Sequence, residues 1–268
     1  VLVVTTRPYV GLCDYGVGGQ IGMEPTLGEH LEVMVKVFRE VKRVLKPSGT
    51  LWLNYGDCYA TTPNGRSAAD YKAMGDDDRT FRDKPFSTIQ GSFKPKDLCM
   101  IPNRLAIALQ DDGWWVRSEI VWSKPNPMPE SIRDRPASAH EKIWLLSKRK
   151  SYFFDTVAVK EPVTGNAHAR KSNESFHAAV SELFSTRNLR NVWEIPSAPF
   201  REAHFATFPP ALVERCAKAG TSEQGACTDC GKPWVRQVET TYSHPGNRPP
   251  HGTIHIKRPP DTADLAPA

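Results

Sequence analysis

The sequence predicts an α/β protein with a doubly wound, mostly parallel sheet. Two apolar runs, Val1–Val4 and Thr50–Tyr55, are typical of buried parallel strands, because their apolar residues follow one another without regular polar alternation. From Leu31 to Leu45 apolar residues recur every three or four positions, which predicts a long amphipathic helix between the two strands. Strand, helix and strand in this order form a right-handed parallel βαβ unit in nearly all known proteins.

This unit brings two polar segments to one edge of the predicted sheet. The carboxyl ends of parallel strands meet at the same edge, so we expect Thr5–Tyr9 and Asn54–Asp57 to lie close together. Ligands of open α/β sheets bind at this edge. Taken alone, Thr5–Tyr9 is compatible with a binding site and with a strand-to-loop turn that has no chemistry.

The rest of the chain alternates between regular and irregular segments. Residues 60–95 and the region beyond Tyr242 are rich in polar residues, glycine and proline, so we expect a long loop over the sheet edge and a disordered tail. The remaining predicted elements are a helix from Ile101–Asn103 to Asp111–Gly113, a strand over Trp114–Trp122, two antiparallel strands over Glu141–Leu146 and Ser151–Phe154 joined by the basic turn Ser147–Lys150, and a helix over Pro210–Ala219.

The bulk composition narrows the function classes. A chain of 268 residues holds one large domain, alone or with a small appendage. The net charge of +5 and the pI of about 8.9 favour a polyanionic partner. No apolar run approaches the roughly 20 residues that span a bilayer, and no charged and apolar leader precedes Val1. We therefore expect a soluble, cytoplasmic protein that does not contact membranes.

Residues 155–200 carry basic side chains interleaved with aromatic rings. This pattern fits a nucleic-acid surface, because phosphates attract cations and exposed bases stack on aromatic rings. A solvated loop with a few apolar anchors has the same composition, so the pattern leaves both interpretations open.

Five ordered blocks resemble the amino-methylating DNA methyltransferases, in the permuted class that places the catalytic motif before the target-recognition region. In that family a Thr-Ser-Pro-Pro-Tyr or Asp-Pro-Pro-Tyr motif ends a strand, and this chain has Thr-Thr-Arg-Pro-Tyr at positions 5–9. The resemblance covers most of Val1–Thr221. It implies a partial doubly wound sheet of the S-adenosylmethionine-dependent methyltransferase type, with an inserted irregular recognition region. The blocks are Thr5–Tyr15, Leu45–Asp57, Trp122–Asn126, His140–Trp144 and His204–Pro209.

The resemblance implies site-specific transfer of a methyl group from S-adenosylmethionine to the exocyclic amine of a flipped cytosine (N4) or adenine (N6) in double-stranded DNA. That amine is a poor nucleophile, because its lone pair is delocalised into the ring, and it lies inside the duplex until the base is flipped. Tyr9 is expected to stack on the base, with Pro8 beside it. The Thr6 hydroxyl and the Arg7 carbonyl are expected to accept the amine protons, so that direct transfer needs no covalent intermediate.

The resemblance also implies which residues contact the cofactor and the DNA, and how the chain is divided. The residues expected to contact S-adenosylmethionine are Thr5, Asn54, Gly56, Asp57, His204, Phe205, Ala206, Thr207, Phe208 and Pro209. The basic residues expected to contact DNA are Lys124, Lys148, Arg149, Lys150, Arg170 and Lys171. The implied parts are a catalytic half over 1–154, a DNA target-recognition region over 155–200, a cofactor-side helix block over 201–221, a partial zinc-ribbon-like segment over 222–241 and a disordered tail over 242–268.

Departures from the family pattern open alternatives to an active enzyme. Thr6 stands where the family has serine, which keeps the hydroxyl but adds a methyl group in a tight pocket. Arg7 stands where the family has proline, which loosens the turn and brings a cation near the cationic cofactor. The family's Asp-Pro-Phe-x-Gly-Ser-Gly turn does not occur after Thr221, and the first strand begins abruptly at Val1, so we expect a chain truncated at both ends. The Val1–Thr5 strand would then have an open edge for a complementing fragment or a second copy. The alternatives are an inactive DNA-binding remnant and an unfolded product.

Cys227 and Cys230 are spaced like one knuckle of a zinc ribbon, in which a Cys-x-x-Cys turn supplies two of four tetrahedral ligands. His244, His251 or His255 would have to complete the site. The pair is compatible with a zinc ion and with a turn that carries two free thiols.

Overall fold

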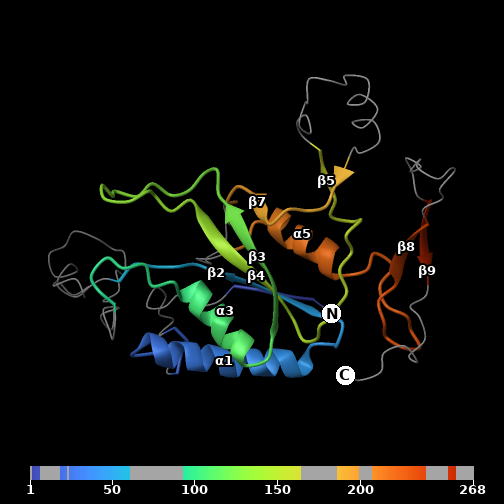
Figure 1. The fold of residues 1–268 in the computed structure, drawn as a ribbon, viewed down its shortest axis with the longest axis horizontal. Helices are drawn as coiled ribbons and strands as arrows, with labels where there is room; N and C mark the ends of the chain where they lie inside the picture. Colours follow the sequence, from blue (N-terminus) through green and yellow to red (C-terminus); the bar gives the residue numbers. More distant parts are fainter. Residues whose placement is uncertain are drawn as a thin grey trace, which may run out of the picture.

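A five-stranded sheet forms the centre of the protein (Figure 1). The computed structural model describes residues 2–6, 19–22, 24–60, 93–163, 186–198, 207–239 and 253–257. The strands lie in the order β1 (Leu2–Thr5), β2 (Thr50–Tyr55), β4 (His140–Ser147), β3 (Trp115–Ser123) and β7 (Val192–Glu194). Four of these strands run in one direction and β4 runs against them. The predicted α/β class with a mostly parallel sheet is therefore confirmed.

Helix α1 (Leu27–Val44) is the predicted crossover between β1 and β2. It begins with a capping box, in which the Glu29 N–H donates to the Thr26 hydroxyl at 3.1 Å and the Thr26 N–H donates to the Glu29 carboxylate at 3.1 Å. Met34 and Phe38 are buried on its inner face, one helical turn apart. The apolar spacing in the sequence therefore predicted both the helix and the face that it buries.

Helices cover both faces of the sheet (Figure 1). On one face α1 packs with α3 (Ile101–Asp111), and their shared core includes Leu53 of β2. On the other face lies α5 (Pro210–Gly220), whose core includes Trp52. Successive side chains of β2 thus enter opposite cores, as the alternation of a strand requires.

Helix α5 runs antiparallel to β1, and this direction positions its first residues. A Cβ atom added to Gly220, the last residue of α5, would lie 2.7 Å from Leu2 Cδ1 and 2.9 Å from Thr50 Oγ1. The carboxyl end of α5 therefore sits against the amino ends of β1 and β2, so closely that a Cβ atom would require the Leu2 or Thr50 side chain to shift. Its amino end, at Pro210, consequently points toward the carboxyl ends of the strands.

The predicted hairpin between Glu141–Leu146 and Ser151–Phe154 is wrong. Both edges of β4 are occupied, one by β2 and one by β3, so no further strand can pair with it. Residues 151–154 instead pack against the face that α5 covers, where the Phe154 ring stacks on Trp52 with centroids 6.3 Å apart. The Phe153 N–H donates to the carbonyl of Ser48 at 3.0 Å.

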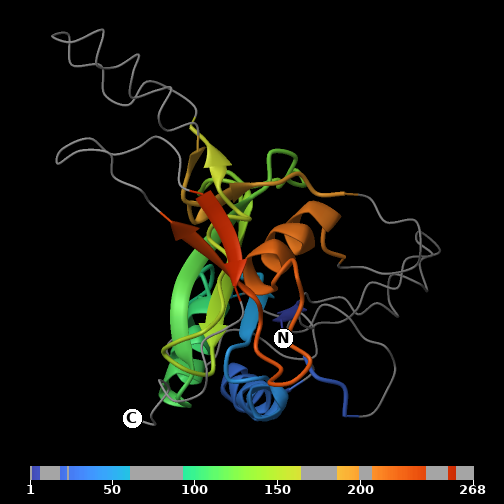
Figure 2. The same ribbon diagram turned by 90° about the vertical axis from the view of Figure 1, so that its right-hand side faces the viewer.

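Two small strand pairs lie outside the central sheet. β5 (Glu161–Pro162) pairs with β6 (Thr186–Arg187), and β8 (Val235–Glu239) pairs with β9 (Thr253–Lys257). β9 lies in the region predicted as a disordered tail, so that prediction is wrong for these residues, whose backbone forms an antiparallel ladder with β8. The β8–β9 hairpin stands in front of the sheet in Figure 2.

The predicted loop over 60–95 lies largely outside the described residues. Across the described ranges, no helix has the length and the apolar character needed to cross a membrane.

Candidate active site at the carboxyl edge of the sheet

The predicted catalytic turn starts at the carboxyl end of β1. Thr5 is in register with Leu53, so the next residues of β1 and β2 emerge side by side at one edge of the sheet. The Thr5 hydroxyl donates to the Thr6 carbonyl at 2.8 Å, which fixes the first peptide after the strand. The Thr6 hydroxyl makes no hydrogen bond to any residue that the structure describes, so its oxygen is available to accept a hydrogen bond from a ligand. Arg7, Pro8 and Tyr9 lie outside the described residues, and their roles stay predictions.

The segment after β2 is held by its own polar side chains. The buried Asn54 amide donates to the carbonyl of Lys142 at 3.1 Å and locks β2 to β4. The Asp57 carboxylate accepts the N–H of Cys58 at 2.9 Å and the N–H of Ile101, the first residue of α3, at 3.1 Å. Loss of solvent raises the pKa of Asp57 above its ordinary value, and the two N–H donors oppose that rise.

Asn54, Gly56 and Asp57 were all expected to contact the cofactor. The structure places all three at the predicted edge: Gly56 is buried, and Asp57 is exposed as a residue although its carboxylate, bonded to the first N–H of α3, is partly shielded from solvent. The Asn54 amide and the Asp57 carboxylate bind the protein's own backbone. Their contact with a cofactor stays a prediction.

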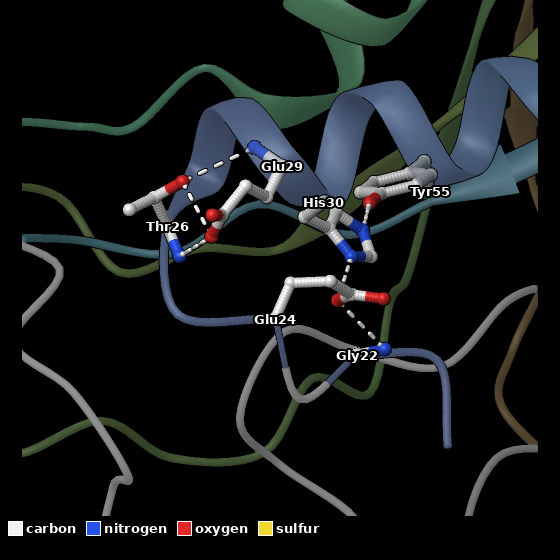
Figure 3. A network of polar contacts seen from close by, with 6 residues as sticks. All are labelled: Gly22, Glu24, Thr26, Glu29, His30 and Tyr55. Atoms are coloured by element: carbon white, nitrogen blue, oxygen red, sulfur yellow. Dashed lines mark hydrogen bonds and ion pairs between the residues drawn. The ribbon is translucent and has the colours of Figure 1, made fainter. Parts of the chain in front are cut away.

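A buried polar chain connects α1 with the end of β2 (Figure 3). His30 is fully buried, with Nδ1 2.6 Å from the Glu24 carboxylate and Nε2 2.7 Å from the Tyr55 hydroxyl. Nδ1–H donates to the carboxylate, which also accepts the N–H of Gly22 at 2.9 Å. These polar contacts therefore link Gly22 and Glu24, in the connection between β1 and α1, to Tyr55 at the end of β2.

Sequence reasoning missed this chain. Its signal was a histidine on the apolar stripe of α1, since His30 lies one turn before the buried Met34. A polar residue at such a position needs a buried partner. The identity of that partner, Tyr55, depends on the packing of α1 against β2 and could not be found from local spacing.

Part of the predicted cofactor block lies near this edge. Thr207, Phe208 and Pro209 precede α5, whose amino end points toward the carboxyl ends of the strands. Phe208 packs on the same hydrophobic cluster as Val4 of β1. The structure thus brings these three residues toward the catalytic turn. His204, Phe205 and Ala206 lie outside the described residues.

The predicted DNA-contacting lysines separate into two groups. Lys124 follows β3 at the carboxyl edge, pairs with Glu141 and lies 4.4 Å from the centroid of the Trp122 ring. Lys148 lies at the opposite edge, because Ser147 before it pairs with Thr50 at the start of β2.

At that edge the Lys148 ammonium donates to the carbonyl of Leu45 at 3.1 Å, just beyond the end of α1. Arg149 and Lys150 follow it, so these three residues are not brought together with the catalytic turn. Arg170 and Lys171 lie outside the described residues.

Cys227 and Cys230 form a tight turn. The Gly231 N–H donates to the Cys227 carbonyl at 2.9 Å, and the Cys227 N–H donates to the Lys232 carbonyl at 2.8 Å. Gly231 has a φ of +68°, which favours glycine. Cys227 is buried and Cys230 is exposed. Within the described ranges no third histidine, cysteine or carboxylate joins them, so these residues do not complete a tetrahedral zinc site.

Comparisons with known proteins agree with this fold. A protein family described as DNA methylase matches residues 1–230. Type II methyltransferase M.XycI of Xanthomonas campestris pv. cyanopsidis is 46% identical over 219 residues, which cover 82% of this chain and 65% of the relative. Type II methyltransferase M.SmaI of Serratia marcescens is 44% identical over 227 residues, which cover 85% of this chain and 70% of the relative.

A solved structure is also similar. The PvuII DNA methyltransferase, described as cytosine-N4-specific, has a TM-score of 0.51 at 16% identity, over 84% of this chain and 65% of that chain, which shows a shared fold. The chain therefore spans about two thirds of the length of these relatives.

Proposed function

Because the chain belongs to the DNA methylase family that matches residues 1–230, we propose that it transfers a methyl group from S-adenosylmethionine to the exocyclic amine of a base in double-stranded DNA. Cytosine N4 is the first candidate acceptor, since the PvuII enzyme of similar fold is described as cytosine-N4-specific. Adenine N6 is the alternative acceptor.

One observation carries the proposal. β1 and β2 end side by side, so Thr5 and Thr6 lie beside Asn54–Asp57 at the edge where ligands of α/β sheets bind. The amino end of α5, with Thr207–Pro209 before it, points to the same edge. Three segments far apart in the sequence thus converge on one place, as a site for two substrates requires.

The residues at this edge support direct methyl transfer. The Thr6 hydroxyl accepts a hydrogen bond from the exocyclic amine, as does the Arg7 carbonyl, and these bonds localise the lone pair on nitrogen. Tyr9 stacks on the flipped base and holds the amine in line with the methyl group. S-adenosylmethionine would supply the methyl group as an electrophilic sulfonium: the bond from nitrogen to the methyl carbon forms as the sulfur–methyl bond breaks, the neutral thioether leaves, and one amine proton passes to solvent. The described residues predicted to contact it at this edge are Thr5, Asn54, Gly56, Asp57, Thr207, Phe208 and Pro209.

The free edge of β1 supports a role for a further segment. Within the described part of the chain, β1 pairs with β2 alone. An open strand edge exposes unpaired N–H and C=O groups that a further strand can satisfy. A complementing segment with the family's Gly-rich turn, or a second copy of this chain, would pair there. We place the reaction in the cytoplasm, where DNA and S-adenosylmethionine meet.

Zinc is a separate part of the proposal. Cys227 and Cys230 would supply two ligands, and the other two would have to come from outside the described residues or from another chain. Metal analysis of the purified protein, with Cys227→Ser as control, tests this. About one zinc per chain in the parent protein and none in the variant supports the site, and no zinc in either contradicts it.

Methyl transfer is tested with isotope-labelled S-adenosylmethionine and mixed-sequence DNA. We expect label in the DNA, either with the protein alone or with an added fragment that carries the family's Asp-Pro-Phe-x-Gly-Ser-Gly turn and its strand. Absence of label under both conditions contradicts the proposal. DNA binding that weakens steeply with salt and is indifferent to S-adenosylmethionine would then identify an inactive DNA-binding remnant.

A further inference from the structure

The connection between β3 and β4, residues 124–139, carries an apolar side chain at its exposed part. Met128 is 86% exposed, the highest value among the large hydrophobic residues of the described structure. Single exposed apolar residues are common on protein surfaces and need no function by themselves. What distinguishes Met128 from such residues is the construction and the placement of this connection, here called the arm.

The arm is held by specific polar contacts on both of its limbs. The Asn126 amide donates to the Ser197 carbonyl at 3.2 Å and accepts the Ser197 N–H at 2.9 Å. Arg135 donates to the Glu130 carboxylate at 2.8 Å and lies 3.8 Å from the centroid of the Tyr59 ring. These contacts anchor the arm before and after Met128.

The backbone around Met128 is also restricted. Pro127 and Pro129 flank it, and a third proline stands at position 125. Proline fixes its own φ and confines the residue before it to extended conformations. Much of the entropy of ordering this segment is therefore lost on folding, before any partner binds.

The arm leaves the sheet at the edge of the proposed active site. It begins after Ser123 and ends before His140, which pair with each other, and two residues along β4 Lys142 is in register with Tyr55 at the end of β2. Figure 1 shows the arm running out beyond the sheet at the end where β2 finishes. Met128 thus belongs to a connection that extends from the edge at which the proposed function places the DNA base.

The charges of the arm suit a polyanion. Both of its carboxylates are paired, Glu130 with Arg135 and Asp134 with Lys96 at 2.6 Å. Hydrogen bonds from Arg135 lower the pKa of Glu130, so its charge persists together with that of its partner. Arg133 is exposed and has no acidic partner among the described residues, which leaves its guanidinium free for a phosphate.

We propose that Met128 enters the DNA duplex and fills the space that the flipped base leaves. The inference rests on the proposed function, since only a flipped base creates such a space. Flipping costs a few kcal/mol of lost stacking and pairing. Methionine and proline are among the apolar side chains that DNA-bending proteins insert between bases. A rigid arm with one exposed methionine offers such a wedge.

The test compares binding to intact duplexes with binding to the same mixed-sequence duplexes carrying scattered abasic sites. An abasic site offers the space without flipping, so the recognition sequence need not be known. We expect the parent protein to bind abasic duplexes about tenfold more tightly, because burial of one methionine side chain lowers the dissociation constant by about a factor of ten. Met128→Ala should lose most of this preference and Met128→Leu should retain it. Val44→Ala, at an exposed residue on α1, is the matched control and should leave it unchanged.

Each outcome decides one claim. A parent protein without preference for abasic sites, or a Met128→Ala variant that keeps the full preference, overturns the inference. Methyl transfer by a parent protein that shows no such preference overturns the inference and leaves the proposed function intact. The abasic preference in a protein that transfers no methyl group, with or without the complementing fragment, overturns the proposed function alone.

Discussion

Thr6 is the described residue on which the proposed chemistry depends most. Its hydroxyl has no hydrogen-bond partner among the described residues, while its carbonyl is held by Thr5. Thr6→Ala removes one acceptor from the reacting amine, so we expect the rate of methyl transfer to fall about a hundredfold or more. Thr6→Ser keeps the hydroxyl and should retain most of the rate. Equal rates for the alanine and serine variants would contradict the assigned role.

His30 is expected to contribute to stability through its two buried contacts. His30→Leu leaves the Glu24 carboxylate and the Tyr55 hydroxyl without this partner, at a cost of roughly 1–3 kcal/mol for each group. We expect the free energy of unfolding in urea to fall by about 2 kcal/mol or more. Glu32→Gln, at an exposed site on α1, serves as control. A loss of unfolding free energy no larger than that of the control would show that the two His30 contacts do not stabilise the fold.

Asp57 gives a prediction for pH dependence. Loss of solvent raises the pKa of its carboxyl in the folded protein above the ordinary value of 3.8, so folding favours the protonated form. Its contribution to stability is therefore greatest in acid and falls as the pH rises through the raised pKa. Asp57→Asn removes this titration, so the variant should gain stability relative to the parent between pH 4 and pH 7, measured by urea unfolding. A stability difference independent of pH would contradict the shift.

The sequence located some of these residues and missed others for a physical reason. Thr6 and Asp57 follow strands that could be recognised from local apolar runs, so their edge was predictable. The contact between His30 and Tyr55 joins residues 25 positions apart, and only the packing of α1 on β2 creates it. Arg7, Pro8 and Tyr9 remain predictions.

At the scale of elements, α1 and the β1–α1–β2 unit were predictable because their signals are local. The capping box at Thr26 and the stripe through Met34 and Phe38 lie within one helix. The hairpin assigned to Glu141–Leu146 and Ser151–Phe154 failed because strand pairing is non-local. The partners of β4 come from β2 and β3, and nothing in the spacing of residues 141–154 shows that both of its edges are taken.

The packing of α5 on the sheet can be tested with two glycines. Gly220→Ala places a Cβ 2.7 Å from Leu2 Cδ1, so we expect a loss of about 1–3 kcal/mol in the free energy of unfolding. Gly28→Ala in α1 meets only Thr26 Oγ1 at 3.9 Å, and should be neutral or stabilise by up to about 1 kcal/mol. Thermal and urea unfolding of both variants check this. Equal effects would contradict the close approach of α5 to β1.

At the scale of the whole molecule, one edge of the sheet gathers the described residues that the proposed methyl transfer uses, while Lys148, Arg149 and Lys150 lie at the opposite edge. Thr6 follows β1, Asp57 follows β2, α5 points its amino end there, and the arm with Met128 runs out beyond it. The Cys227–Cys230 turn lies elsewhere, since Gly231 accepts a hydrogen bond from Lys46 near the start of β2. The arrangement separates the proposed chemistry from this turn.

The central claim is that this edge methylates an exocyclic amine of DNA. The most direct test is mass spectrometry of nucleosides from mixed-sequence DNA incubated with the protein and methyl-labelled S-adenosylmethionine, with and without a fragment carrying the Gly-rich strand. We predict labelled N4-methylcytosine, with N6-methyladenine as the alternative product, and loss of label with Thr6→Ala. No labelled nucleoside under either condition, or label at carbon 5 of cytosine, would contradict the claim.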